Sequence, residues 1–514
     1  MQIRKTAVVI ILLLILLLQV GLRLPFLHVP LDRDEGAYGY MAQRILAGEV
    51  PYRDAFDHKP PLVYFIYASL VKLFGNSISA IRVPTLLYSL LTTVALFYLG
   101  FLLLGAGGGL LAAFLYALFS GGILIQGASS NTETFMVLPL ILAFCCFLLS
   151  GKMREDQGKS GKIRMGMIFL AGLFSGIAIM IKQVAVFNFV VLLGFLLFDK
   201  VQSPKSKVAC AGDIGQKTLD VGLRVLLGVW ILMFGFLVFP LLFTLYFLLK
   251  GAFSDYIYDV FLVNRQYLRS LPFGPLARMI NGIYTTFVIA KLENSILWVF
   301  GLTGLFCIFF KDRLKQNLLL AFWSLASIVA VAASGLFFGH YYIQLIPALC
   351  LLSAYAIKRI TKEAGFLLKA AIVLVALFLV FSIIPYQYPV YFKFTLEQVS
   401  ERQYGKLSYV ISYKLAQKLK ELMKPQEKIF VWAANPEMYF YLEKKSPTRF
   451  YNYLGWMESE ENKQEIVRSV IKERPEYMIW TDYNFRYNEL VDFVEGEYRL
   501  FMMIGNWKVF KIIK

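Results

Sequence analysis

The chain has 514 residues, of which 58% are hydrophobic and 17% charged, and it carries a formal net charge of +18. Soluble globular chains are about 45–50% apolar and about 25% charged, and a single core stops growing at roughly 250–300 residues. This composition excludes a cytosolic enzyme, a secreted disulfide scaffold and a disordered chain. Repeated uncharged apolar runs of about 20 residues predict a polytopic α-helical membrane protein instead.

Eleven apolar segments are predicted as spans, although Lys182-Gln183 divides the stretch 166–198 and a single tilted helix is the alternative there. With the N-terminus inside, the inner connections hold 17 Lys and Arg in 63 residues, against 13 in 116 residues outside. This asymmetry follows the positive-inside rule and predicts a cytoplasmic N-terminus and an outer C-terminus. The spans are 6–22, 83–104, 109–127, 135–150, 166–181, 185–198, 223–249, 292–309, 318–337, 342–357 and 365–385.

The first outer segment, residues 23–82, is far longer than the usual connection of about 4–6 residues. Asp34 fits a helix N-cap, and helical periodicity follows it until Gly48. Pro60-Pro61 then begin a second, amphipathic helix over 62–74 that could lie in the membrane interface. We therefore expect an ordered segment just outside the bilayer.

Charged side chains gather at two places in this segment, three carboxylates at one and an acid, a histidine and a lysine at the other. Like charges crowded near a low-dielectric surface raise the pKa of a carboxyl group, which suits a general base. The alternatives are a helix cap with a dipole-favoured acid and a polar loop before a proline. The two groups are Asp32, Asp34 and Glu35, and Asp57, His58 and Lys59.

Further polar residues stand at the outer ends of later spans. Glu133, which follows Asn131, is costly at that depth unless it is paired or used, and a helix cap is the alternative. Lys182, beside Gln183, could bind a phosphate or only reach the interface. The other candidates are Arg265 with Arg269 and Arg278, which could clamp a phosphate or only solvate their loop, and His340 with Tyr341, for which an aromatic belt is the alternative.

The tail, residues 387–514, is polar enough to fold in water. The runs 428–433 and 476–481 predict strands, and 459–474 predicts a helix with one apolar face. Residues 498–513 predict a hairpin that turns at Gly505-Asn506. The chain therefore divides into a transmembrane part, 1–386, and a small extracytoplasmic α/β domain, 387–514.

The first outer segment resembles that of GT-C membrane glycosyltransferases. The motifs are Asp34-Glu35 followed by Tyr38 and a helix, and then His58-Lys59-Pro60-Pro61 before an amphipathic helix. The likeness is greatest to bacterial relatives of the dolichyl-phosphate-mannose protein mannosyltransferases and to the lipid A aminoarabinose transferases. Residues 131–133, 182–183 and 340–342 resemble later landmarks of that group, and the layout agrees over about residues 5–385. His58 departs from the acid that aminoarabinose transferases carry before Lys-Pro-Pro, and the tail does not resemble a β-trefoil.

The resemblance implies transfer of a sugar, with inversion, from a polyprenyl-phosphate carrier to a hydroxyl of a lipid, glycan or protein outside the bacterial cytoplasmic membrane. It implies Asp34 as general base, Glu35 as its support and Glu133 as second carboxylate. Lys59 and, less strongly, Lys182 would contact the phosphate or the sugar. The remaining substrate-binding candidates are Tyr38, His58, Asn131, Gln183, Arg265, His340 and Tyr341. No cofactor is required, although the pattern is compatible with a divalent metal; membrane lipids are partners and nucleic acid is not.

Two other classes of function compete with this one. A transporter or flippase of an anionic or polyprenyl-linked lipid would explain the spans and the outer cations. Such a protein should place ionisable groups near mid-span, yet most spans are uncharged. An envelope scaffold whose tail binds partners would leave the acidic first segment unexplained.

Overall fold

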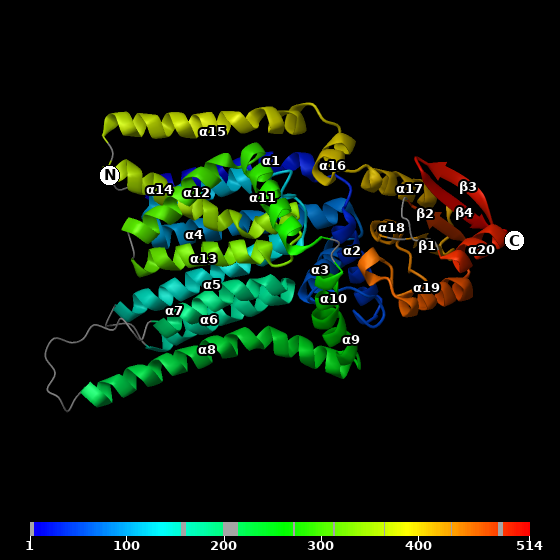
Figure 1. Ribbon diagram of the computed structural model, residues 1–514, viewed down its shortest axis with the longest axis horizontal. Coiled ribbons are helices and arrows are strands. Elements are labelled where there is room, and N and C mark those ends of the chain that lie inside the picture. The colour runs from blue at the N-terminus through cyan, green and yellow to red at the C-terminus, as the bar shows by residue number, and fades with distance from the viewer. Residues whose placement is uncertain are drawn as a thin grey trace.

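The structure is a computed structural model that describes residues 5–155, 161–198, 214–270, 273–311, 314–363, 365–432, 434–481 and 487–513. Long helices form a bundle, and a small sheet with short helices lies beyond one end of it (Figure 1). The N-terminus lies at the opposite end of the bundle from the C-terminus (Figure 1). Most of the basic connection predicted at 199–222 lies outside the described residues.

The bundle helices overlap the predicted spans, although the helix predicted over 109–127 ends at Phe119 and the one predicted over 318–337 ends at Ala332. Among the described residues, seven helices are long and apolar enough to cross a membrane, or eight if α11 (Pro275–Leu292) and α12, bent by 112°, form one span. The count of eleven spans therefore stays a prediction. The bundle contains α1 (Lys5–Arg23), α4 (Ile78–Phe119), α5 (Thr132–Glu155), α6 (Gly161–Ile181), α7 (Val186–Phe198), α8 (Ile214–Leu249), α12 (Ser295–Lys311), α13 (Lys315–Ala332), α14 (Ile346–Glu363) and α15 (Phe366–Phe392).

Helix α4 is two helical segments joined at Gly105, whose φ of 76° is in the left-handed region. A Cβ added to Gly100 would lie 2.8 Å from the Cα of Gly109. In a straight helix those residues would be about 13 Å apart, so the chain reverses direction at Gly105. The two halves correspond to the predicted segments 83–104 and 109–127. The stretch 166–198 is likewise two helices, because the backbone of Lys182 is extended.

Four short helices lie between the bundle and the sheet: α2 (Arg33–Leu46), α3 (Leu62–Phe74), α9 (Phe253–Ile257) and α10 (Val263–Arg269) (Figure 1). A π-helical turn at Tyr258–Leu262 joins α9 to α10. Helix α3 has the predicted bounds, as expected from its proline start and its glycine end.

The predicted N-cap of α2 is wrong, because the cap is Asp32 and not Asp34. The Asp32 side chain accepts a hydrogen bond from the Glu35 amide at 2.8 Å, and the Glu35 carboxylate accepts one from the Asp32 amide at 3.2 Å. This reciprocal pair is a capping box, in which Glu or Gln stands three residues after the cap. Asp34 is left free for other partners.

The C-terminal part contains a four-stranded sheet in the order β1-β2-β4-β3. β1 and β2 are parallel, and the other two pairings are antiparallel. The predicted strands, helix and hairpin of the tail are all present. The elements are α16 (Leu396–Tyr404), α17 (Ser408–Leu422), β1 (Ile429–Trp432), α18 (Glu437–Leu442), α19 (Glu460–Glu473), β2 (Tyr477–Trp480), α20 (Asn488–Glu497), β3 (Tyr498–Ile504) and β4 (Trp507–Ile512).

Helix α18 packs directly on α2. A Cβ added to Gly36 would lie 2.5 Å from the Cα of Glu437, and one added to Gly39 would lie 2.7 Å from a ring carbon of Phe440. Gln43 Nε2 also donates to the Phe440 carbonyl at 3.0 Å. Residues of α2, α3, α18 and the sheet share one hydrophobic cluster. The tail therefore fixes the position of α2, and its description as a separate domain stays a prediction.

Candidate active site

A cavity of about 350 Å³ lies where the first outer segment, the helix ends and the C-terminal part meet. This volume is within the range of small-ligand sites, roughly 300–1,000 Å³. The walls combine charged, aromatic and aliphatic side chains. The residues singled out from the sequence that line the cavity are Asp34, Asp57, His58, Lys59, Lys182, Gln183, His340 and Tyr341.

Asp34 forms an ion pair with Lys59 in this cavity. Lys59 Nζ donates to Asp34 Oδ2 at 2.7 Å, and the two side chains are 17% and 20% exposed for the lysine and the acid. Arg33 Nε lies 3.7 Å from the other carboxylate oxygen. The ring of buried Tyr38 supports the pair, because Lys59 Nζ lies 4.7 Å from its centroid. The first turn of α2 and the loop before α3 thus place the Asp34 carboxylate and the Lys59 ammonium group together at the wall of a ligand-sized cavity.

The charges around Asp34 reverse the pKa shift expected from crowded carboxylates. Burial alone would raise the pKa of Asp34, but the cations of Lys59 and Arg33 hold it well below its usual range. The expected rise occurs at Asp32 instead, where burial, Glu35 and Asp34 raise the pKa to about 8. Asp34 is therefore ionised at neutral pH.

Both histidines of the cavity are uncharged at neutral pH. Burial lowers the pKa of His58 to about 4, with Asp57 opposing the shift. Burial also lowers the pKa of His340 to about 4, with Glu133 opposing it. His340 Nδ1 lies 3.2 Å from Gln126 Oε1. The positive charge of the cavity therefore comes from Lys59, Lys182 and Arg33.

Glu133 reaches the cavity only through Lys182. Glu133 is fully buried and does not line the cavity, whereas Lys182 lines it and donates a hydrogen bond to the Glu133 carboxylate. Lys182 Nζ also lies 4.1 Å from the ring centroid of Tyr341. Glu133 therefore orients the ammonium group of Lys182, which faces the cavity.

Asn131 does not line the cavity. Its side chain is buried, and neither of its polar atoms has a hydrogen-bond partner.

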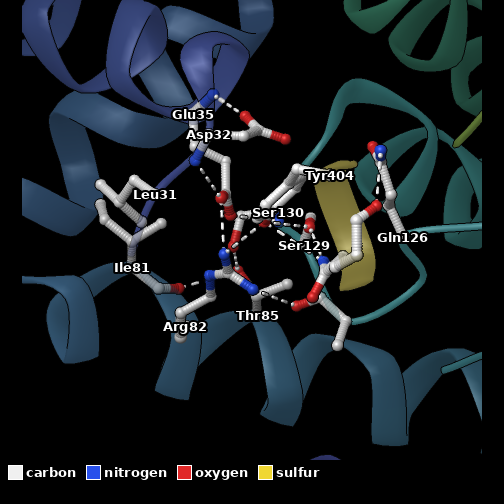
Figure 2. Close-up of polar contacts among 12 residues, drawn as sticks. Leu31, Asp32, Glu35, Ile81, Arg82, Thr85, Gln126, Ser129, Ser130 and Tyr404 are labelled. Atoms are coloured by element: carbon white, nitrogen blue, oxygen red, sulfur yellow. Dashed lines mark hydrogen bonds and ion pairs between the residues drawn. The ribbon is translucent and has the colours of Figure 1, made fainter. Parts of the chain in front are cut away.

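Glu35 lies outside the cavity in a sealed polar cluster (Figure 2). It is 0% exposed, and it accepts hydrogen bonds from Arg82 Nη2 at 2.6 Å and from the Ser130 amide at 2.7 Å. Arg82 also donates to the Ala128 carbonyl at 3.0 Å and to the Tyr404 hydroxyl at 3.1 Å. The structure thus does not bring Glu35 to the cavity. The cluster instead ties the first turn of α2 to the loop before α5.

Arg265 is also not brought to the cavity. It is exposed on α10, whereas its neighbours Asn264 and Tyr267 line the wall. Asn264 Nδ2 and Gln183 Nε2 both donate to the His58 carbonyl, at 2.7 and 3.4 Å. These two amides fix the loop that carries His58 and Lys59.

One wall of the cavity comes from the C-terminal part and was not predicted from the sequence. Asn452, Leu454 and Trp456 line the cavity, together with Tyr267 of α10. The residues at 452–456 lie almost 400 positions after Lys59 and Tyr267 lies 208 positions after it, and no spacing rule joins them to the first segment. The aromatic and amide side chains of residues 451–456 are the feature of the sequence that could have indicated this wall.

The described residues contain no group of three His, Cys, Asp or Glu side chains that could hold a metal ion. The charged groups beside Asp34 are the cations of Lys59 and Arg33. The compatibility of the site with a divalent metal stays a prediction.

The chain is similar to one protein-family model and to several solved structures. A family model described as dolichyl-phosphate-mannose-protein mannosyltransferase matches residues 58–212. A comparison with curated proteins gave no match in sequence.

Among solved structures, ArnT from Cupriavidus metallidurans bound to undecaprenyl phosphate is similar, with a TM-score of 0.64 and 14% identity over 99% of this chain and 98% of that one. The archaeal oligosaccharyltransferase AglB from Archaeoglobus fulgidus, in complex with an inhibitory peptide and a dolichol-phosphate, has a TM-score of 0.57 and 14% identity over 93% of this chain and 69% of that one. The resemblance to GT-C membrane glycosyltransferases is therefore confirmed, and the chain has their fold.

Proposed function

We propose that this chain is an integral-membrane glycosyltransferase that moves a sugar from a polyprenyl-phosphate donor to a hydroxyl of a lipid, glycan or protein acceptor. One observation carries the proposal: the Asp34–Lys59 pair faces a ligand-sized cavity in a fold shared with a structure that holds undecaprenyl phosphate. The reaction takes place on the outer face of the bacterial cytoplasmic membrane.

The cations of the cavity suit a phosphate leaving group. Lys59 and Lys182 both line the cavity, and the histidines beside them are uncharged. Placed donors in a site that excludes water stabilise the charge that develops on a leaving oxygen. Lys59 therefore takes up the negative charge of the departing lipid phosphate, and Lys182, held by Glu133, adds a second cation.

Asp34 is the proposed general base. The acceptor oxygen attacks the anomeric carbon, the bond from that carbon to the phosphate oxygen breaks, and the electron pair leaves with the polyprenyl phosphate. Asp34 receives the hydroxyl proton. When the donor phosphate draws Lys59 toward itself, Asp34 loses the nearer of its two cations, and its pKa rises because the effect of burial is then less opposed. Donor binding thus turns a weak base into a stronger one.

The arrangement favours a single displacement and therefore inversion at the anomeric carbon. Retaining enzymes with two carboxylates need the second one as a nucleophile close to the first. Here Asp34 and Asp57 line the cavity, while Glu133 is buried behind Lys182 and Glu35 is sealed behind α2. Asp57 accepts hydrogen bonds from the His58 amide and the Tyr451 hydroxyl, and its side chain is 6% exposed against 20% for Asp34. Asp34 is therefore the carboxylate proposed to meet the sugar.

Binding of undecaprenyl phosphate to the purified protein in lipid nanodiscs tests this proposal. We expect binding by the wild type and a loss of about tenfold or more in Lys59→Gln, because a charged contact to the phosphate is removed. Lys72→Gln is the matched control, since Lys72 is exposed on α3 and does not line the cavity. Absence of binding by the wild type, or equal binding by both variants, would contradict the proposal.

A further inference from the structure

Three aromatic rings from distant parts of the chain meet at the cavity. His58 comes from the first outer segment, Tyr267 from α10, and Trp456 from a 3-10 turn at Gly455–Met457. The ring centroids are 5.2 Å apart for His58 and Trp456, 5.0 Å for Tyr267 and Trp456, and 5.8 Å for His58 and Tyr267. The interplanar angles are 80°, 59° and 43°, so no pair is stacked face to face. Ring surface therefore remains for a ligand.

The ring surface suits a ligand with one apolar face and a polar edge. Tyr and Trp supply large, rigid area with a polar atom at the end. A sugar ring has such a shape, because its axial C–H bonds form an apolar face and its hydroxyls surround it. The uncharged state of His58 at neutral pH agrees with a neutral ligand on this side.

Asn452 supplies an unused polar atom on the same wall. Its Oδ1 is buried and has no hydrogen-bond partner, and the residue lines the cavity. Buried polar groups in proteins nearly always have a partner. A hydroxyl of a bound ligand would be the missing donor.

The wall is held rigidly against the first outer segment. The Phe56 amide donates to the Arg449 carbonyl at 3.0 Å. The Tyr451 hydroxyl, fully buried, donates to Asp57 Oδ2 at 3.4 Å. Residues that lead into Asn452 are therefore fixed before any ligand arrives, which lowers the entropic cost of binding.

We infer that Tyr267, Asn452 and Trp456 form a subsite for a sugar ring, so that the C-terminal part selects the sugar while Lys59 and Lys182 hold the phosphate. The inference rests on the proposed function and adds the chemistry of the ligand to it. The sugar belongs either to the donor or to a glycan acceptor, and both present the same ring and hydroxyls.

Two binding measurements distinguish these sources. The first compares undecaprenyl phosphate with the same lipid carrying glucose or mannose, and gives the ratio of affinities with and without the sugar. The second measures the affinity of methyl glycosides of these sugars while undecaprenyl phosphate fills the donor site. The variants are Trp456→Ala, Trp456→Phe and Asn452→Leu. The matched control is Phe501→Ala, on β3 and outside the cavity.

We expect Trp456→Ala to lose about tenfold in one of the two measurements, because an aromatic contact is removed, while its affinity for bare undecaprenyl phosphate stays unchanged. Trp456→Phe should retain most of the effect, Asn452→Leu should show a smaller loss, and Phe501→Ala none. A loss in the first measurement assigns the subsite to the donor sugar, and a loss in the second assigns it to the acceptor.

Unchanged values for Trp456→Ala and Asn452→Leu in both measurements would overturn the inference and leave the proposed function intact. A wild type that binds bare lipid but prefers no sugar in either measurement would overturn it too. A wild type that fails to bind undecaprenyl phosphate would instead contradict the proposed function.

Discussion

Two adjacent residues of α2, Asp34 and Glu35, each form an ion pair, and the two pairs differ in their exposure to solvent and to the cavity. The Asp34–Lys59 pair is 20% and 17% exposed and lines a cavity, whereas the Glu35–Arg82 pair is 0% and 1% exposed and has four further internal partners. A single helical turn thus carries one acid with free capacity for a ligand and one acid whose oxygens are fully used. Chemistry is expected at the first pair and stability at the second.

Asp34→Asn should have the largest effect on the open pair. Loss of a general base typically costs about a hundred- to ten-thousand-fold in rate, and the amide cannot accept the acceptor proton. The fold should be unaffected, because Asp32 and not Asp34 caps α2. Single-turnover transfer and thermal unfolding of the purified variant measure both quantities. A rate near that of the wild type would move the base elsewhere, with Glu133 next in order.

Arg82→Gln should have the largest effect on the sealed pair. Removing one partner of a buried ion pair costs about 3–5 kcal/mol, because the other charge is left without compensation. We expect a clear fall in the melting temperature, with unchanged affinity for undecaprenyl phosphate in the folded fraction. A variant as stable as the wild type but unable to transfer sugar would show that the sealed cluster acts in catalysis. That result would contradict the stabilising role assigned to the Glu35–Arg82 pair.

Lys59→Met should change the pH dependence of the residual activity. In the wild type, Lys59 helps to hold the pKa of Asp34 well below its usual range, so Asp34 stays ionised as the pH falls. Without that cation, burial raises the pKa, and protonation of Asp34 begins at a higher pH. The acidic limb of kcat/KM should therefore shift upward in the variant. An identical limb in both proteins would show that Lys59 does not set the charge of Asp34.

Asp32→Asn should have the smallest effect. Asn caps helices about as well as Asp, so α2 should form normally. The pKa of Asp32 is raised to about 8 from an ordinary value of 3.8, so the folded state binds the proton more tightly than the unfolded state. The wild type should then lose stability as the pH rises from about 4 to about 8. The melting temperature of the variant should fall less over this range, and a parallel fall in both proteins would contradict the assignment.

The sequence predicted the elements that local signals define. Helix α3 begins after Pro60-Pro61 and ends at Gly75 as expected, and the hairpin turns at Gly505. The reversal at Gly105 also follows from the glycine-rich run between two apolar segments. The Asp32-x-x-Glu35 spacing is that of a capping box, and local signals alone do not decide between it and a cap at Asp34.

Long-range contacts account for what the sequence did not predict. The pKa direction of Asp34 depends on Lys59, 25 residues away, and the cavity wall at Trp456 depends on the docking of α18 against Gly36 and Gly39 of α2. Helical and strand periodicity describe one element at a time. Periodicity contains no information on which distant element packs against a given helix or strand.

Analysis of polyprenyl-phosphate lipids in cells tests whether this chain uses a polyprenyl-phosphate sugar as its donor. We expect a deletion strain to accumulate a polyprenyl phosphate carrying a sugar, because its consumption has stopped. The same lipid should accumulate when the strain expresses Asp34→Asn, and it should disappear when the strain expresses the wild-type chain. Identical lipid profiles in the deletion strain and its parent, measured by mass spectrometry, would contradict the claim that this chain uses such a donor.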